Sequence, residues 1–388
     1  MALRLITAGE SHGPGLTCIV EGIPAGLELT DEDLNRDMAR RQLGHGRGGR
    51  MKIERDRAEP TGGVRHGRTL GGPIALQVTN RDFANWEERM SPWPVEADVA
   101  EVHLPRPGHA DLVGVQKYNF TDVRNVLERA SARETAARVA GGSVCRALLR
   151  AVGVEVVSHV TRIGTECAPD YVEPLAVADF AAVDESPVRC LDADASRAMV
   201  EHINVQRRAN ESLGGVFEVR AYGLVPGLGS HVSWEERLDG RLAGALCSIQ
   251  AIKGVALGDG FALAALPGSE AHDEIFHSDE RGFYRETNHA GGLEGGMTTG
   301  DPLLVSAAMK PLPTLTKPLR SVNIATLLPG EALRERTDSC TVPAAGVVGE
   351  AMVAYVLADA YRRKFGGDHI DDMRAAVDAY RARIGWAR

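Results

Sequence analysis

The stretch RLITAGESHGPGLTCIV, residues 4–20, contains two short β-type runs that flank one glycine-rich loop. The runs 4–8 and 16–20 are rich in Leu, Ile, Val and Thr, which favour strands. The loop between them is too short for the crossover that parallel strands need, so the two runs are predicted to pair antiparallel. An antiparallel sheet combined with separate helices indicates the α+β class.

Similar β-type runs recur along the chain and predict further strands at residues 73–78, 154–160, 215–222 and 303–308. These runs do not alternate with helices at the regular spacing of a doubly wound parallel sheet. Several antiparallel sheets are therefore expected.

Helical patterns occupy much of the remaining chain. Capping patterns mark two of the expected starts, Thr30 with Asp33 and Ser233 with Glu236. A pair of glycines at 366–367 marks one expected end. The predicted helices cover about 30–41, 122–150 as one long Ala-rich helix, 233–252 and 346–364, with a last polar helix after Asp368.

Length and composition describe an ordinary globular chain: 388 residues, 44% hydrophobic and 25% charged. No fixed-period repeat or Pro/Ser-rich linker divides it, so we expect one domain over 1–388 with a helical tail at about 365–388. The sequence shows neither a signal-peptide pattern nor a run of 18 apolar residues, so no membrane span is expected. The six cysteines form no CxxC pair and no zinc-type cluster, which favours a reducing, cytoplasmic setting without a metal site.

Arginine and lysine concentrate in residues 36–68, which hold ten of them against four acidic residues. This local charge of +6 contrasts with a formal net charge of −9 for the whole chain. The net charge argues against bulk attraction to nucleic acid or to an anionic membrane. Guanidinium groups interleaved with glycines instead suit a small, multiply charged anion. A solvated basic face is the alternative interpretation.

Two glycine-containing motifs permit other interpretations. GHGRGG, residues 44–49, fits the dinucleotide pattern GxGxxG but follows a predicted helix instead of a strand, so a Rossmann fold is rejected. The same residues resemble RGG segments without their repeats, which leaves an Arg/Gly-rich anion or nucleic-acid binding protein as one alternative. GESHG, residues 9–13, fits the GxSxG pattern of a serine hydrolase using Ser11, but a strand is predicted behind the loop where that motif needs a helix.

Two histidines lie in glycine- or proline-rich loops. His12 has few neighbouring side chains in its loop to cover it, which favours a ligand-facing role. His109 follows a Pro/Gly turn and precedes Asp111 by two residues, a spacing that lets a carboxylate orient an imidazole. Each histidine, taken alone, could equally be structural.

Three further segments are candidate ligand contacts. The loop NHAGGLEGGMTTG, 288–300, suits a flat ring or a phosphate lying against backbone, although a flexible hairpin would look the same. Lys310 stands beside two prolines that stiffen the chain. Arg334, Arg336 and Asp338 share one face if their stretch is extended. Alone, each could be a surface turn.

Taken together, these motifs resemble the chorismate synthase family over residues 1 to about 360. The resemblance rests on eight segments in order: GESHG, RRQLGHGRGGR, RPGHADLVGVQKY, RNVLERASARETAARVAGG, SIQAIKGV, NHAGGLEGGMTTGDPL, AAMKPLPTL and RTDSCTVPAAGVVGEA. It implies helices sandwiched between antiparallel β-sheets and a homotetramer. It also implies an anti-1,4-elimination of phosphate from 5-enolpyruvylshikimate 3-phosphate to give chorismate, the last shared step of the shikimate pathway. That reaction requires reduced FMN without net redox change.

The resemblance also implies residue roles. His12 matches the histidine that stabilises or protonates the leaving phosphate, His109 the one at the flavin pyrimidine edge, and Asp338 the acidic residue near the flavin N5. Arg41 and Arg47 match positions that contact NADPH or substrate anions, two ligands that charge does not separate. Flavin contacts are implied at Arg129, Ala130, Ser131, Gln250, Ala251, Gly295, Lys310, Pro311, Leu312, Pro313, Thr314 and Arg336.

The sequence departs from the usual family pattern in a few places. His66 and Arg68 are more basic than expected, and the segment before Arg336 lacks the commoner serine after its arginine. Neither departure touches His12, His109 or Asp338. No long insertion is recognisable, which favours members that receive reduced flavin over members that reduce it with NADPH.

Overall fold

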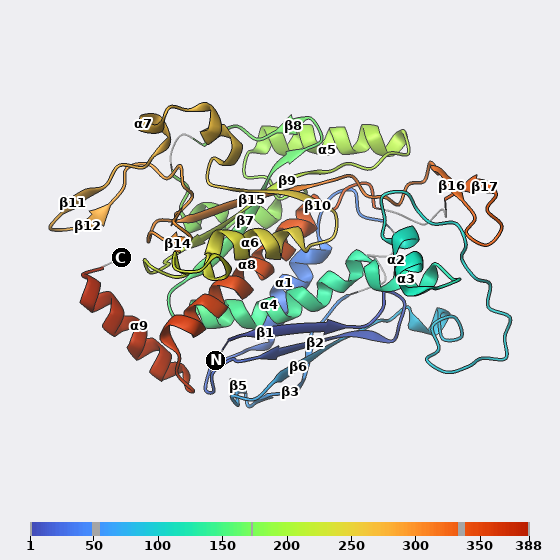
Figure 1. Ribbon diagram of the computed structural model, residues 1–388, viewed down its shortest axis with the longest axis horizontal. Coiled ribbons are helices and arrows are strands. Elements are labelled where there is room, and N and C mark those ends of the chain that lie inside the picture. The colour runs from blue at the N-terminus through green and yellow to red at the C-terminus, as the bar shows by residue number, and fades with distance from the viewer. Residues whose placement is uncertain (1, 49–54, 172–173, 333–337, 387–388) are drawn as a thin grey trace.

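Two antiparallel sheets enclose a layer of helices in the computed structural model, which describes residues 2–48, 55–171, 174–332 and 338–386 (Figure 1). The first sheet has the strand order β1-β2-β6-β3: Arg4–Ala8, Gly15–Glu21, Ile74–Thr79 and Glu59–Gly62. The second has the order β10-β15-β9-β7-β8: Ile252–Leu257, Leu303–Met309, Gly215–Tyr222, Glu155–Ile163 and Glu166–Cys167. The six predicted strands are confirmed.

The β1–β2 hairpin forms as predicted, with Arg4 opposite Glu21 and Ala8 opposite Thr17. Its tight turn depends on Gly9, whose φ is +106° and whose added Cβ would stand 2.4 Å from a carbonyl oxygen of the chain. The hairpin therefore places the loop 9–14 at the end of the first sheet.

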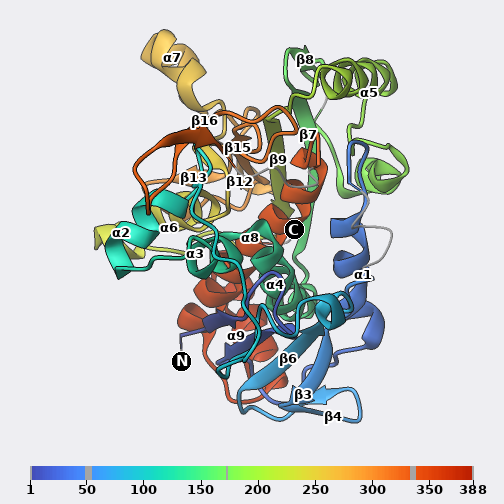
Figure 2. The ribbon, with the colours of Figure 1, turned by 90° about the vertical axis from the view of Figure 1, so that its right-hand side faces the viewer.

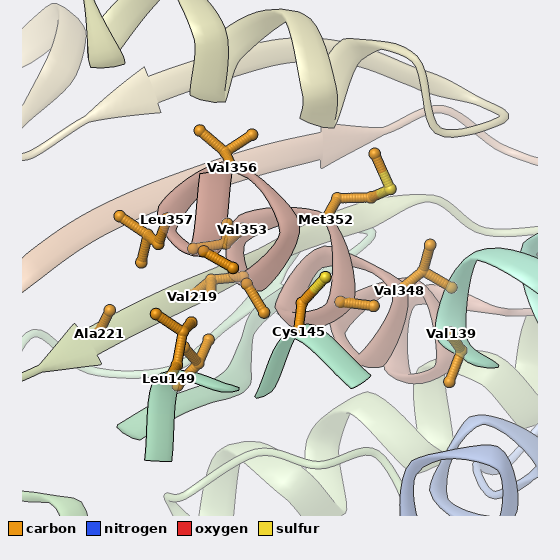
Figure 3. Packing of buried hydrophobic residues seen from close by; sticks show 14 of the residues in the cluster. Val139, Cys145, Leu149, Val219, Ala221, Val348, Met352, Val353, Val356 and Leu357 are labelled. Atoms are coloured by element: carbon orange, nitrogen blue, oxygen red, sulfur yellow. The ribbon is translucent and has the colours of Figure 1, made fainter. Parts of the chain in front are cut away.

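Four helices fill the space between the sheets: α1 (Asp31–Gln42), α4 (Thr135–Arg150), α6 (Leu238–Cys247) and α8 (Val342–Phe365). α4 packs on the first sheet and against α8, which in turn packs on β7 and β9 of the second sheet. Figure 3 shows Cys145 of α4, Val353 of α8 and Val219 of β9 at this junction, all fully buried. The expected sandwich of helices between antiparallel sheets is thus confirmed.

Helix α8 is long and apolar enough to cross a membrane by length and composition alone, the one such helix in the described part of the chain. However, 94% of its most apolar window is buried inside the protein. Its apolar character is that of a central core helix.

The predicted single helix over 122–150 is wrong, because the chain breaks at Ser131. α3 (Arg124–Ala130) ends there, and a 3₁₀ turn at Ala132–Glu134 leads into α4. Ser131 has φ −61° and ψ 141°, outside the helical region, and its hydroxyl accepts a hydrogen bond from the backbone N–H of Arg133. The serine acts as an N-cap in the middle of an otherwise helix-favouring run.

The helix predicted over 233–252 is also shorter than expected. Ser233 makes no side-chain cap and instead begins a 3₁₀ turn at Trp234–Glu236. The extended backbone of Arg237 (ψ 127°) delays α6 until Leu238, and the helix ends at Cys247. By contrast, the capping box at the start of α1 is confirmed: Thr30 and Asp33 each accept the other's backbone N–H.

The remaining elements surround this sandwich. In the turned view of Figure 2, α2 and α3 lie at one edge of the helical layer and α1 lies at the other. A small separate hydrophobic cluster joins α2 to α3. The helices are α2 (Asp111–Tyr118), α5 (Ala193–Arg208), α7 (Gly268–Ala271) and α9 (Ile370–Ile384), the last being the predicted polar helix. The short strands are β4 (Val64–Arg65), β5 (Arg68–Thr69), β11 (Phe276–Ser278), β12 (Gly282–Tyr284), β13 (Leu293–Glu294), β14 (Met297–Thr298), β16 (Arg320–Val322) and β17 (Pro329–Glu331).

Candidate active site

A buried carboxylate from α3 holds His12, at the tip of the β1–β2 hairpin. His12 Nδ1 lies 2.8 and 3.0 Å from the two carboxylate oxygens of Glu128, and the backbone N–H of His12 donates to the same side chain at 2.9 Å. Burial alone would raise the pKa of Glu128, but the hydrogen bonds and charge of His12 and the charge of Arg124 outweigh it and hold this pKa below its usual range. The carboxylate is therefore ionised at neutral pH.

An indole ring covers one face of His12. Trp86, in the turn after β6, stacks on the imidazole at 3.8 Å between ring centroids and 25° between planes. The guanidinium carbon of Arg124 lies 5.3 Å from the Trp86 centroid, and Arg124 Nη1 donates to Glu128 at 3.0 Å. His12, Trp86, Arg124 and Glu128 thus form one packed cluster, in which only 17% of the His12 side chain is exposed.

Arg129 and Ser131, at the end of α3 and just after it, contact the same loop. Ser131 Oγ donates to Ser11 Oγ at 3.2 Å. The Arg129 guanidinium donates to the backbone oxygens of Thr7 (2.9 Å) and Gly9 (3.2 Å). These contacts join the end of α3 to strand β1 and to the loop that follows it.

His109 has its own carboxylate partner, as its spacing suggested. His109 Nδ1 lies 2.5 Å from Asp111 Oδ1, while Arg106 Nε donates to Asp111 Oδ2 at 2.8 Å. Asp111 is fully buried. Burial would raise the pKa of Asp111, but the hydrogen bonds from His109 and Arg106 reverse this and hold it far below its usual range.

The segment Lys310 to Thr314 connects the His109 loop to a cavity. Lys310 Nζ donates to the backbone oxygen of Gly108 at 2.9 Å, next to His109. Burial lowers the pKa of Lys310, and the charge of Lys253 adds to this effect. Farther along, Ser212 Oγ donates to the backbone oxygen of Leu312 at 2.9 Å. The proline-stiffened segment therefore runs from His109 toward the residues around Asp338.

Asp338 lines that cavity and pairs with Arg47. Asp338 Oδ1 accepts the backbone N–H of Gly48 at 2.5 Å, and Oδ2 lies 3.2 Å from Arg47 Nη1. The cavity measures about 320 Å³ and is lined by Gly48, Arg207, Asn210, Glu211, Ser212, Thr314, Leu315, Thr316, Asp338 and Ser339. Arg336, the other candidate in this segment, lies outside the described residues, as does Arg334.

The basic segment 36–68 divides into structural and site-facing residues. Arg41 lies behind the break at Ser131: Nε donates to Thr135 Oγ1 at 3.0 Å and Nη1 to Asp56 at 3.3 Å. Arg40 is buried in an ion network, with Nη1 and Nη2 donating to Glu350 at 2.6 and 2.9 Å. The local +6 charge therefore overstates the number of arginines that a ligand could use.

Known proteins resemble this chain in both sequence and structure. The chorismate synthase family model matches residues 3–361. The chain belongs to the chorismate synthase family. A chorismate synthase from Rubrobacter xylanophilus is 57% identical over 385 residues, covering 99% of this chain and 98% of the relative. One from Acidothermus cellulolyticus is 55% identical, covering 97% and 98%. A crystal structure of a chorismate synthase superposes with a TM-score of 0.78 at 40% identity, covering 99% of this chain and 98% of that one.

Membership of the chorismate synthase family fixes the class of function. The enzyme is a lyase of aromatic amino-acid biosynthesis that acts on 5-enolpyruvylshikimate 3-phosphate, and its family depends on a flavin. The predictions of family, fold class and reaction are confirmed, and neither the nucleic-acid binder nor the serine hydrolase is supported. The loop after Ser11 indeed leads into strand β2. Within the described residues, no group of three His, Cys, Asp or Glu side chains is placed to hold a metal ion.

The flavin on which the family depends would need polar contacts, and residues 250–251 offer them. Gln250 Nε2 donates to Glu134 at 3.1 Å, whereas its buried Oε1 has no hydrogen-bond partner among the described residues. Such an acceptor suits an N–H of a flavin ring. Ala251 has φ +69°, a strained value for a non-glycine residue, and its carbonyl accepts the backbone N–H of Lys310 at 2.9 Å. The residues present therefore fit a flavin.

Gly295, another candidate flavin contact, lies apart from Gln250 and Ala251. It lies at the tip of the β13–β14 hairpin, and a Cβ added there would meet nothing within 4 Å. The neighbouring Gly296 packs at the start of α6 against Leu238, whereas Gln250 follows the end of that helix. The length of α6 therefore separates Gly295 from Gln250 within this chain.

The residues that sequence reasoning missed are the partners of the histidines. Apart from Asp111, no sequence pattern indicated the residues that contact or surround the two histidines. These are Glu128, Arg124 and Trp86 around His12, and Arg106 beside His109. Arg124 and Glu128 are four residues apart in the motif RNVLER, which indicates a helical ion pair. Nothing local in the sequence indicates that this pair meets a loop 116 residues away.

Proposed function

We propose that the enzyme eliminates phosphate from 5-enolpyruvylshikimate 3-phosphate in the anti-1,4 sense, using reduced FMN, and releases chorismate. The observation that carries this proposal is the contact between His12 Nδ1 and Glu128, at 2.8 and 3.0 Å. With Nδ1 held by the carboxylate, Nε2 is the nitrogen that we assign to the substrate. The reaction breaks one C–O bond and one C–H bond of the ring and forms a C=C bond.

His12 acts on the departing phosphate. Cleavage of the C–O bond leaves negative charge on the phosphate oxygen, and an imidazolium N–H at Nε2 stabilises or protonates that oxygen. Trp86 and Glu128 hold the ring in place before the charge develops. Arg47, which pairs with Asp338, adds positive charge to the site.

Reduced FMN, when bound, supplies electron density to the substrate ring and leaves the overall reaction without redox change. Gln250, Ala251, Arg129, Ala130, Ser131 and Lys310 to Thr314 would hold it, together with Arg336. His109, with Nδ1 held by Asp111, would offer its other nitrogen to the flavin and would favour the anionic form of the reduced ring. Asp338 relays the proton that leaves the substrate ring.

Several finer features of the enzyme belong to the same proposal. The enzyme assembles as a homotetramer in the cytoplasm and binds neither nucleic acid nor membranes. It receives reduced flavin from outside, whereas reduction by NADPH, with Arg41 and Arg47 as contacts, is the alternative. Burial of Arg41 beside Asp56 and Thr135 supports a role in shaping the 131–135 turn more than direct contact with NADPH.

An anaerobic assay tests the reaction. The purified enzyme is mixed with 5-enolpyruvylshikimate 3-phosphate and chemically reduced FMN, and phosphate release and chorismate absorbance are followed together. Both products should appear in equal amounts. NADPH with oxidised FMN, used in place of reduced FMN, should give no product if reduced flavin comes from outside. Folded enzyme that binds flavin but releases no phosphate would overturn the proposal.

A further inference from the structure

We propose that Glu128 is a positioning residue that fixes the tautomer of His12, so that turnover depends on its carboxylate. This inference rests on the proposed function of His12 and concerns how that histidine is made ready. Glu128 lies on α3 and contacts the His12 ring at Nδ1 and the His12 backbone at its N–H, so its effect reaches the substrate through the imidazole ring.

Three donors converge on the Glu128 carboxylate. They are the His12 backbone N–H at 2.9 Å, His12 Nδ1 at 2.8 and 3.0 Å, and Arg124 Nη1 at 3.0 Å. The carboxylate is only 2% exposed, so water does not compete for these bonds. An ionised carboxylate can only accept, so Nδ1 must carry a proton to make its contact.

A proton on Nδ1 determines the state of Nε2. In the neutral ring Nε2 then has a lone pair, and in the cationic ring it has the single N–H that can be handed to the phosphate. A ring free to adopt the other tautomer would place its neutral-state proton on Nε2 and lose this arrangement. The contact with Glu128 therefore selects which nitrogen exchanges protons with the substrate.

Glu128 also fixes the loop that carries the ring. Its backbone oxygen accepts the N–H of Ser11 at 3.1 Å, so one residue holds the Ser11–His12 dipeptide by both main chain and side chain. Trp86 stacks on the ring face at 3.8 Å. The imidazole is thus restrained along its Nδ1 edge and on one face.

The variant Glu128→Gln tests this role at nearly constant volume. The glutamine amide offers one oxygen acceptor and one NH₂ donor to the three groups that now donate to Glu128. Of these three groups, only the His12 imidazole can accept a hydrogen bond instead, and it does so by moving its proton from Nδ1 to Nε2. We expect kcat to fall at least about 100-fold while KM for the substrate changes less than about 3-fold. A kcat near that of the wild type would overturn the proposal.

Glu218→Gln is the matched control. Glu218 is a largely buried carboxylate on β9 that contacts a buried histidine, His159, at 3.3 Å and Arg220 at 2.5 Å. His159, Glu218 and Arg220 thus resemble the set of His12, Glu128 and Arg124, but they lie in the second sheet, outside the candidate site. We expect Glu218→Gln to leave kcat within about 3-fold of the wild type. An equal loss in both variants would show a general cost of removing buried carboxylates and would overturn the proposal.

The ¹⁵N NMR spectrum of protein labelled in its histidine rings reads the tautomer directly, with the His12→Gln spectrum assigning the signal. We expect neutral His12 to be protonated at Nδ1 in the wild type and at Nε2 in Glu128→Gln. A wild-type ring protonated at Nε2 would overturn the proposal even if the variant did not fold. Failure of the wild type to release phosphate would instead overturn the proposed function, whatever tautomer the spectrum shows.

Discussion

The carboxylate of Asp338 accepts a hydrogen bond from the backbone N–H of Gly48, with 2.5 Å between oxygen and nitrogen. Its second oxygen lies 3.2 Å from Arg47. The loop after α1 is thereby tied to the segment that leads into α8. The residue that we propose as the proton relay therefore also anchors Arg47 and Gly48.

Asp338→Asn separates these two contributions. The amide oxygen can still accept the Gly48 N–H, so we expect the loop and flavin binding to persist. The amide cannot take up a proton, so kcat should fall by about 100-fold or more. Steady-state kinetics with reduced FMN, together with a flavin titration, measure both effects. Retention of full turnover would exclude Asp338 as the relay.

In Asp111→Asn, the free energy of unfolding should depend less on pH in the acid range. The pKa of Asp111 is lower in the folded chain than the value of about 3.9 expected when unfolded. Its ion pairing therefore stabilises the fold above that value, and this contribution is lost as the pH falls below about 4. At pH 7 the variant leaves Arg106 buried without its charge partner, and we expect the free energy of unfolding to fall by about 3 kcal/mol.

Denaturant unfolding at pH 7 and at about pH 3.5 would measure the Asp111 effect. The difference in free energy of unfolding between wild type and Asp111→Asn should begin to narrow at the lower pH. There the unfolded wild type takes up a proton on Asp111, whereas folded Asp111 stays ionised. A gap that stays constant or widens on acidification would contradict the sign of the Asp111 pKa shift.

Glu350→Gln tests the buried ion network between the helices. Glu350 is fully buried and accepts from Arg40, Arg146 and Arg189, whose charges outweigh the effect of burial and hold its pKa far below the usual range. Removing its charge leaves three buried guanidinium groups short of a partner, so we expect a loss of about 3–5 kcal/mol in the free energy of unfolding.

Glu21→Gln is the control for the buried network. Glu21 pairs with Arg4 at 3.9 Å on the surface, where both side chains are well exposed. Its loss should change the free energy of unfolding by less than about 1 kcal/mol. Equal effects of Glu350→Gln and Glu21→Gln in thermal or urea unfolding would show that the network contributes no more than a surface pair.

The sequence predicts the strands and several helices correctly because runs of β-favouring residues and capping residues lie within the segments that they define. The β-type runs at 4–8 and 16–20 and the capping box of Thr30 with Asp33 all formed where expected. The break at Ser131 escaped prediction because the run around it favours helix throughout. Its side chain forms a local cap toward Arg133 and a distant contact with Ser11, and the second depends on tertiary structure.

The candidate site shows the same division between local and long-range information. The spacing of His109 and Asp111 pointed to a contact that the structure contains. The residues around His12 could not be found this way, since Glu128 and Trp86 reach the loop only through the packing of α3 and the turn after β6. Charge counting likewise could not distinguish Arg40, buried against Glu350, from Arg47, which faces the cavity residue Asp338.

Single-turnover phosphate release from His12→Ala tests the central claim most directly. The variant is mixed anaerobically with substrate and reduced FMN, and phosphate and the flavin spectrum are recorded together, with His109→Ala measured in parallel. We predict that His12→Ala releases phosphate at least about 100-fold more slowly while its flavin spectrum stays close to that of the wild type. His109→Ala should instead alter the spectrum. Phosphate release at the wild-type rate from His12→Ala, or equal spectral changes in both variants, would contradict the roles assigned to the two histidines.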